Sequence, residues 1–236
     1  MSTIAERARQ NLGLHYYEQP NFAESVGELH LAIPTERQYV LRCPIQIPGH
    51  DMTVPEEMQW CGEFIELALR HQRDAIGVGH PYAYLTIRSG LVDSVTDDVL
   101  HVDGFSMKVP HAPEQNYIWS NTNPTIVEAY SLVVPEYFDP LVHNLQYLIG
   151  DMRPDNVQQQ AVEANHVYVL DPYVFHRRPI VSPDTVRTFL RLSLTAIPID
   201  DTNNHINPAF GRITSDYDGV ADFRDGLLRY SERTEQ

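Results

Sequence analysis

Short segments rich in β-branched and aromatic residues dominate the second half of the chain. Six of them fall between residues 80 and 197, and the turn sequences DGF, NTNP, LDP and SPDT separate several of them. Runs of this composition with Gly, Pro, Asn and Asp between them are typical of β-strands joined by turns. The pattern excludes a helical bundle and predicts a mainly β domain. The segments are residues 80–90, 116–120, 124–134, 165–170, 172–176 and 186–197.

Helical patterns are concentrated in the first part of the chain. From Thr53 to Asp74, apolar residues recur at helical spacing, and Thr53 is expected to cap this helix, with Pro55 in its first turn. Helices before strands favour an α+β fold in which helices pack outside a β-sandwich or barrel. We predict one domain over residues 1–236, with core strands at about 80–198 and helical support at about 1–79. Shorter helices are expected at residues 3–12, 140–152 and 222–230.

The charge of the chain limits its partners. It has 32 acidic and 17 basic residues, which gives a formal charge of −15. Nucleic acids and anionic membranes bind clustered Lys and Arg, and the sequence contains no basic stripe. No apolar run approaches membrane-spanning length, and the first residues, MSTIAERARQNLG, lack the apolar centre of a signal peptide. We therefore expect a cytoplasmic protein that binds neither nucleic acid nor a membrane; the sequence carries no signal of its oligomeric state.

His101, Asp103 and His176 are candidate ligands of one metal ion. In an extended segment, residues two apart point to the same side, so His101 and Asp103 can bind the same ion. His176 ends an apolar strand and is the candidate third ligand. Two imidazoles and one carboxylate on one face leave the opposite face of the ion open, which suits iron(II) in oxygen chemistry. An H-x-D sequence alone arises often by chance, so the third ligand matters to this hypothesis.

Arg191 and Ser193 are candidates for binding a carboxylate. They lie in the strand sequence TFLRLSLT, where Arg191 shares a face with Ser193 and Phe189. A guanidinium in a largely apolar strand needs an anionic partner, and a dicarboxylic acid supplies one bidentately. Arg187 lies on the same face and competes for this role. We favour Arg191, because it has the R-x-S context and the deeper apolar flanks.

Taken together, these residues resemble the motif of the iron(II)/2-oxoglutarate-dependent dioxygenases, which is H-x-D, a distal His and then an Arg, often within R-x-S. The resemblance covers roughly residues 80–198. It implies a double-stranded β-helix (a jelly-roll or cupin-like core) with supporting helices. It also implies iron(II), with 2-oxoglutarate and O2 as co-substrates, and hydroxylation of an unactivated C–H bond in a small molecule such as an amino acid or natural-product intermediate. The matching residues are His101, Asp103, His176, Arg191 and Ser193.

The resemblance also ranks the competing residues. It implies that His176 is the distal ligand rather than His166, because the family places this histidine shortly before the arginine strand. His111, between two prolines, is a weaker rival. The choice between Arg191 and Arg187 for the distal carboxylate of 2-oxoglutarate stays open, since both spacings from the distal histidine occur in the family.

Three further residues are candidates for contacting the substrate. Arg88 alternates with Tyr84 and Thr86 on one face of its strand, and an arginine facing inward would favour a carboxylate or phosphate on the substrate. Tyr117 and Trp119 follow the metal motif, where the resembling fold lines its pocket. An ordinary core role explains these two aromatic residues equally well.

Two other functions explain part of the pattern. An oxygenase of methylated pyrimidine bases would use the same residues, but the acidic charge disfavours binding to nucleic acid. A cupin-like metal-binding module without oxygen chemistry explains the three candidate ligands and leaves Arg191 and Ser193 without a role. Asp103 disfavours halogenation, because halogenating relatives of the resembling family carry a small residue in its place.

Overall fold

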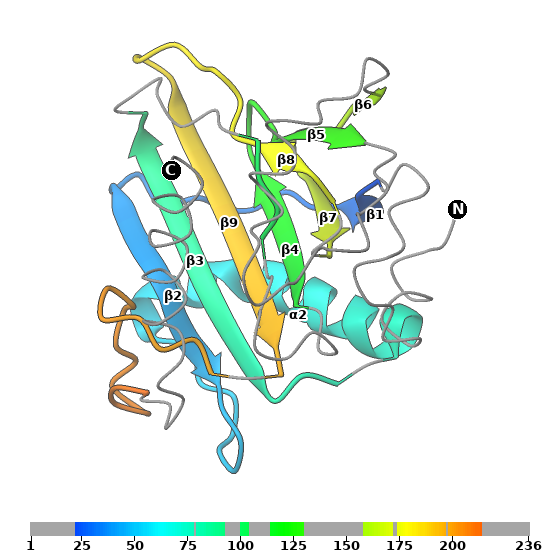
Figure 1. Ribbon diagram of the computed structural model, residues 1–236. Helices are drawn as coiled ribbons and strands as arrows, with labels where there is room; N and C mark the ends of the chain where they lie inside the picture. The colour runs from blue at the N-terminus through cyan, green and yellow to red at the C-terminus, as the bar shows by residue number, and fades with distance from the viewer. Residues whose placement is uncertain are drawn as a thin grey trace, which may run out of the picture.

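Two antiparallel β-sheets form the framework of the described protein. In the computed structural model, the larger sheet has six strands in the order β1-β7-β4-β9-β3-β2 (Figure 1). Its strands are β1 (Glu24–Glu28), β2 (Gln38–Gln46), β3 (Tyr82–Leu91), β4 (Gln115–Ser120), β7 (His166–Leu170) and β9 (Val186–Thr195). The structure describes residues 22–77, 79–92, 100–103, 114–129, 158–171, 174–196 and 198–213.

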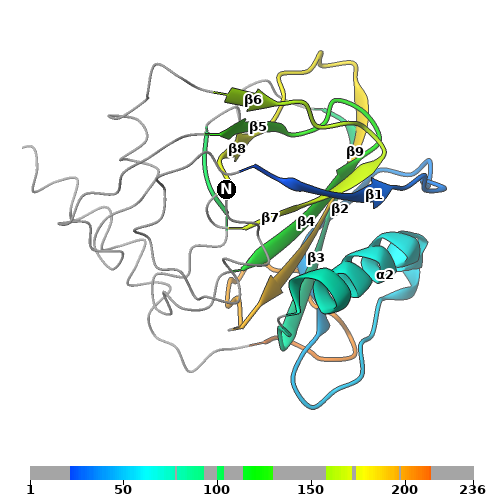
Figure 2. The ribbon, with the colours of Figure 1, turned by 90° about the vertical axis from the view of Figure 1, so that its right-hand side faces the viewer.

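The smaller sheet has the strand order β6-β5-β8, with β5 at Ile126–Ala129, β6 at Gln158–Gln160 and β8 at His176–Arg177. It lies on the side of the larger sheet opposite to helix α2 (Figure 2). Buried side chains join the two sheets, including Ile118 from β4 and Val127 from β5. The described protein is therefore mainly β, with two layers of antiparallel sheet.

Helix α2 (Gly62–His71) covers the other face of the larger sheet. A 3-10 turn (Glu56–Cys61) precedes it and a π turn (Gln72–Ile76) follows it, so the helical stretch matches the predicted one closely. It begins later than predicted, because Thr53 does not cap it: its hydroxyl donates to the carbonyl of Asp51 instead. Among the described residues, no helix combines the length and the apolar character needed to cross a bilayer.

The register of β9 divides its side chains between the two layers. Leu190, Leu192 and Leu194 belong to the main core, which also contains the buried face of α2. The intervening residues point to the opposite face because side chains alternate along a strand. Arg191 is one of them, and it pairs with Thr86 of β3 and Ile118 of β4. The sheet therefore presents this arginine to the space between the two sheets.

Most of the predicted strands are found. The segments predicted at 80–90, 116–120, 165–170 and 186–197 correspond to β3, β4, β7 and β9. The segment predicted at 124–134 is a strand over Ile126–Ala129, and the one predicted at 172–176 gives way to β8, which begins only at His176. The helices predicted at 3–12, 140–152 and 222–230 lie outside the described residues.

The N-terminal part is not helical support alone, as the sequence had suggested, because β1 and β2 both belong to the larger sheet. The alternating pattern of β2 is broken by shifts of register between Val40 and Cys43 and between Pro44 and Gln46. Such bulges place an extra residue in the strand and hide its period of two. Proline is tolerated here because β2 is an edge strand.

Candidate metal centre

Backbone pairing brings His101 and His176 together. The two residues form an isolated antiparallel bridge, in which each N–H donates to the carbonyl of the other at 2.9 Å. Their rings lie side by side, with 4.5 Å between centroids. Two histidines far apart in the sequence are thus fixed next to each other by the main chain rather than by flexible side chains.

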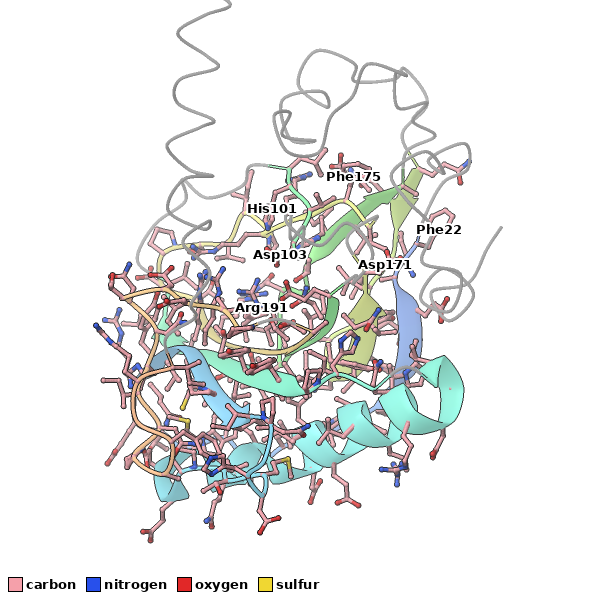
Figure 3. The ribbon with its side chains drawn as sticks, turned by 60° about the horizontal axis from the view of Figure 1, so that its bottom comes forward. Phe22, His101, Asp103, Asp171, Phe175 and Arg191 are labelled. Atoms are coloured by element: carbon pink, nitrogen blue, oxygen red, sulfur yellow. The ribbon has the colours of Figure 1, made fainter. Side chains whose placement is uncertain are left out.

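Asp103 completes the cluster. Its Oδ2 lies 3.4 Å from Nε2 of His176, and one ligand atom from each of the three residues lies within 4.8 Å of the others. In Figure 3, Asp103 lies between His101 and Arg191. The sequence predicted this convergence of His101, Asp103 and His176, and the structure brings the three side chains close enough for one ion to bridge them.

The states of His176 and Asp103 suit metal binding. Nδ1 of His176 lies 3.0 Å from the carbonyl oxygen of Val174, so it donates there and leaves the lone pair of Nε2 directed towards Asp103. Burial by itself would raise the pKa of Asp103, but the charge of Arg191, with smaller contributions from His176 and His101, holds that pKa well below its ordinary value. The carboxylate is therefore ionised, as a metal ligand must be.

Arg191 and Ser193 flank the cluster on β9. One terminal nitrogen of Arg191 donates to Oδ2 of Asp103, while its buried Nε has no hydrogen-bond partner among the described residues. The hydroxyl of Ser193 donates to Oδ1 of Asn116 at 2.6 Å, and the buried Nδ2 of Asn116 is likewise without a partner in the described part of the chain. Buried donors are rarely left unused, so this corner of the site fits an added acceptor such as a carboxylate.

Glu114 is a residue of the site that sequence reasoning missed. Burial raises the pKa of its carboxyl group, against the opposing charge of Arg191, and the carboxyl group hydrogen-bonds Ser193. It thus approaches the same pair of donors that the sequence assigned to a dicarboxylic acid. A single acidic residue in front of an apolar strand carries no signal by which the sequence alone could have identified it.

A cavity of about 420 Å³ opens beside the cluster. Arg88, a candidate substrate residue, lines it, and so does Arg187. The Nε of Arg187 donates to the carbonyl of Asn123 at 2.9 Å, and its guanidinium lies 5.1 Å from the centre of the Phe189 ring. The remaining lining residues are Leu41, Arg42, Thr86, His101, Val102, Asp103, Thr125, His176, Arg177, Arg178, Phe189 and Arg191.

Tyr117 and Trp119 do not line this cavity, which corrects their prediction as substrate residues. Both belong to the core between the larger sheet and α2. The hydroxyl of Tyr117 donates to the side chain of Gln72, and the indole of Trp119 donates to the carbonyl of Leu29. The reason is register: they pair with Leu192 and Leu190 of β9, and paired residues share a face of the sheet.

Of the two rival histidines, the structure describes His166 but not His111. His166 begins β7 and lies beside Glu163, with 3.5 Å between Nδ1 and a carboxylate oxygen, and it is not among the residues that line the cavity. His111 lies outside the described residues. The structure therefore supports His176 over His166 as the partner of the H-x-D segment.

Arg177 and Arg178 are further lining residues whose position the sequence did not reveal. They follow His176 directly in the sequence. Arg177 donates to the buried carboxylate of Glu128 at 2.9 Å. A usable signal was present, since residues 177–191 contain four of the chain's sixteen arginines.

Comparison with known proteins adds no assignment to this geometry. No protein-family model matches the chain, and no curated protein matches it. The function is therefore argued from the site itself.

Proposed function

We propose that the protein is an iron(II)- and 2-oxoglutarate-dependent oxygenase that hydroxylates a C–H bond of a small molecule, and that its two sheets form a double-stranded β-helix. The observation that carries this proposal is the convergence of His101, Asp103 and His176 beside Arg191. A metal-binding site alone fits many functions. A metal-binding site beside the half-buried guanidinium of Arg191 fits an ion that shares its site with a carboxylic acid.

The three ligands suit iron(II) better than a structural ion. Structural zinc sites use four protein ligands, usually with thiolates, whereas this cluster supplies two imidazoles and one carboxylate. Both cysteines are buried elsewhere, in the core of the larger sheet. Iron(II) with 2-oxoglutarate and O2 would supply the oxidising power for C–H hydroxylation. The bridge between His101 and His176 would hold the two imidazoles at fixed separation while the other ligands exchange.

Arg191 is the better candidate for the distal carboxylate of 2-oxoglutarate. It contacts Asp103 directly, so it is adjacent to the ion, and a five-carbon diacid bound to that ion reaches only a short way along the cavity. The unused Nε of Arg191 and Nδ2 of Asn116 provide donors for the carboxylate oxygens. Arg187 lies four residues before Arg191 in β9, which separates the two by about 13 Å at 3.3 Å per residue.

The residues around the cluster would also limit access of water. Val102 and Phe189 contribute apolar surface to the cavity, and Ile118 of the neighbouring strand pairs with Arg191. The side chain of Arg191 is only 14% exposed, so its charge is screened less than in bulk water and interacts more strongly with an anionic co-substrate. Exclusion of water would also protect a reactive site from unproductive side reactions.

Release of succinate from 2-oxoglutarate tests the proposal. The full chain is incubated with Fe(II), ascorbate and O2 across a panel of small molecules, and succinate is measured. We expect succinate formation that requires Fe(II) and is abolished in His176→Ala but retained in His166→Ala, a matched control outside the cluster. Stoichiometric zinc whose binding is indifferent to 2-oxoglutarate, with no succinate across the panel, would instead indicate a metal-binding module without oxygen chemistry.

A further inference from the structure

Arginines are concentrated around the candidate metal centre. Of the ten arginines in the described residues, seven line either the cavity beside the cluster or an adjoining hollow of about 310 Å³. Among the described lining residues, Asp103 is the only one with a carboxylate. This positive lining stands in a chain with a formal charge of −15. A chain that repels anions overall must concentrate positive charge locally to bind one.

Four of these seven arginines already have other interactions within the protein. Arg191 pairs with Asp103, Arg177 with Glu128, and Arg42 lies 3.6 Å from a carboxylate oxygen of Asp201. Arg37 lines only the adjoining hollow and has an interaction of its own.

The other three arginines, Arg88, Arg178 and Arg187, have no ion pair with any described carboxylate. They line both hollows, so they stand at the junction between them. They are also close enough to repel each other: burial, with the charges of Arg178 and Arg88, lowers the pKa of Arg187 to about 10. Three clustered guanidiniums that have no acidic partner among the described residues form an arrangement that a bound oxyanion would stabilise.

We propose that the substrate of this oxygenase carries a compact oxyanion, such as a phosphate, sulfonate or carboxylate group, that binds Arg88, Arg178 and Arg187. The proposal rests on the proposed function and adds the substrate class to it. The anion occupies the junction of the two hollows, and the carbon to be hydroxylated points towards His101 and His176.

The positions of the arginines along the sheet support this division of roles. Arg187 and Arg191 lie on the same face of β9 with Phe189 between them, and Arg88 pairs with Phe189 across the sheet. Phe189 thus lies between the two arginines along the strand, and its ring contacts the guanidinium of Arg187. One anion-binding position is next to the ion and suits the co-substrate, whereas the other lies further along the strand and suits a separate group.

Arg187 is the built part of the proposed subsite. It is only 8% exposed, and its Nε is fixed by the carbonyl of Asn123, so its two terminal nitrogens keep a defined direction. Arg88 is exposed and Arg178 is half-buried, so both can adjust to the size of the anion. The overall acidity of the chain disfavours a long polyanion, which would meet repulsion beyond the junction.

Binding of simple anions tests the proposal without knowledge of the substrate. Inorganic phosphate, methanesulfonate and acetate are titrated into the full chain by calorimetry at constant ionic strength, with and without Mn(II) and 2-oxoglutarate. We expect at least one anion to bind in both conditions, because 2-oxoglutarate occupies Arg191 and leaves the junction free. The anion that binds most tightly identifies the group on the substrate.

Paired substitutions locate the binding. The variant Arg88→Gln/Arg178→Gln is expected to lower the affinity for the anion by about tenfold or more, because charge-assisted hydrogen bonds are lost. Its affinity for 2-oxoglutarate should not change. Its matched control is Arg70→Gln/Arg73→Gln, which removes the same charge from exposed positions of the helical stretch and should leave anion affinity unchanged. Both substituted pairs are accessible to solvent, so neither variant is expected to disturb folding.

Different outcomes would contradict the anion subsite and the proposed function. Dissociation constants weaker than about 10 mM for all three anions, equal weakening in both variants, or loss of anion binding once 2-oxoglutarate is present would overturn the anion subsite. Anion binding at the junction in a chain that binds neither Mn(II) nor 2-oxoglutarate would contradict the proposed function and leave the subsite in place.

Discussion

The two faces of the larger sheet differ in what they contribute to the protein. The face towards α2 is built from leucines of β9 and buried aliphatic residues of β2, β3 and β7. The opposite face carries Arg191, Ser193 and Arg187 on the same strand β9. One strand thus supplies the apolar core with one set of residues and the candidate site with the alternate set. The core face fixes the backbone, and the cavity face uses that rigid backbone to hold charged groups together.

The apolar face of β9 explains why charged residues can be held between the two sheets at this site. Placing a guanidinium between two sheets costs free energy, and one anionic partner such as Asp103 recovers only part of it. The many apolar contacts on the other face of the same strand supply the stability that this cost requires. Substitutions on the two faces should therefore affect different measurements.

The largest effect on stability is expected from Phe64→Ala in α2. Phe64 is fully buried against the sheet, and truncation of a buried aromatic residue lowers the free energy of unfolding by about 3–5 kcal/mol. Chemical denaturation measures this loss. The fraction that remains folded should bind metal with unchanged affinity; reduced metal affinity in that fraction would show that the two faces are coupled.

His176→Ala is expected to have the next largest effect, on the cavity face. Loss of one of three ligands should weaken metal binding by at least about 100-fold, since substitution of outer partners alone costs 10–100-fold. Calorimetric titration with Mn(II) measures this, and His166→Ala serves as the control. Equal effects of the two substitutions would remove His176 from the metal site.

Arg191→Leu should separate the co-substrate from the ion. The substitution removes a charge-assisted interaction, so 2-oxoglutarate is expected to bind about tenfold or more weakly while Mn(II) remains bound. Arg187→Leu is the matched comparison on the same face of β9. If Arg187→Leu weakens 2-oxoglutarate and Arg191→Leu does not, the roles assigned to the two arginines are reversed.

The smallest effect is expected from Tyr117→Phe. Its hydroxyl donates to Gln72 and lies 3.0 Å from Nδ1 of His71, so its removal should lower the free energy of unfolding by about 1 kcal/mol. Succinate release should not change, because Tyr117 lies on the core face. A loss of activity without a loss of stability would return Tyr117 to the substrate pocket.

The sequence predicted the parts of the fold that have regular patterns. The alternation in TFLRLSLT identifies β9 and assigns Arg191 and Ser193 to one face, as the structure shows. Tyr117 and Trp119 have no such signal, because aromatic residues suit a core and a pocket equally well. Only their pairing with Leu192 and Leu190 decides between the two faces, and pairing is a property of the folded sheet.

The missed features have the same origin. The bulges of β2 break its alternation, and Arg42 within one of them has a φ of 45°, a backbone state that is uncommon for residues other than glycine. The gathering of Arg88, Arg178 and Arg187 depends on contacts between three segments that are separate in the sequence. Residue types could be recognised from the sequence, whereas their convergence required the topology.

Coupled binding of metal and 2-oxoglutarate is the most direct test of the account. Calorimetric titration of the full chain with Fe(II) under anaerobic conditions should give one ion per chain, and 2-oxoglutarate should bind more tightly to the iron-loaded protein than to the metal-free protein. By linkage, 2-oxoglutarate must then strengthen iron binding by the same factor. Iron binding that is absent, or that is unaffected by 2-oxoglutarate, would contradict the assignment of His101, Asp103, His176 and Arg191 to one oxygenase site.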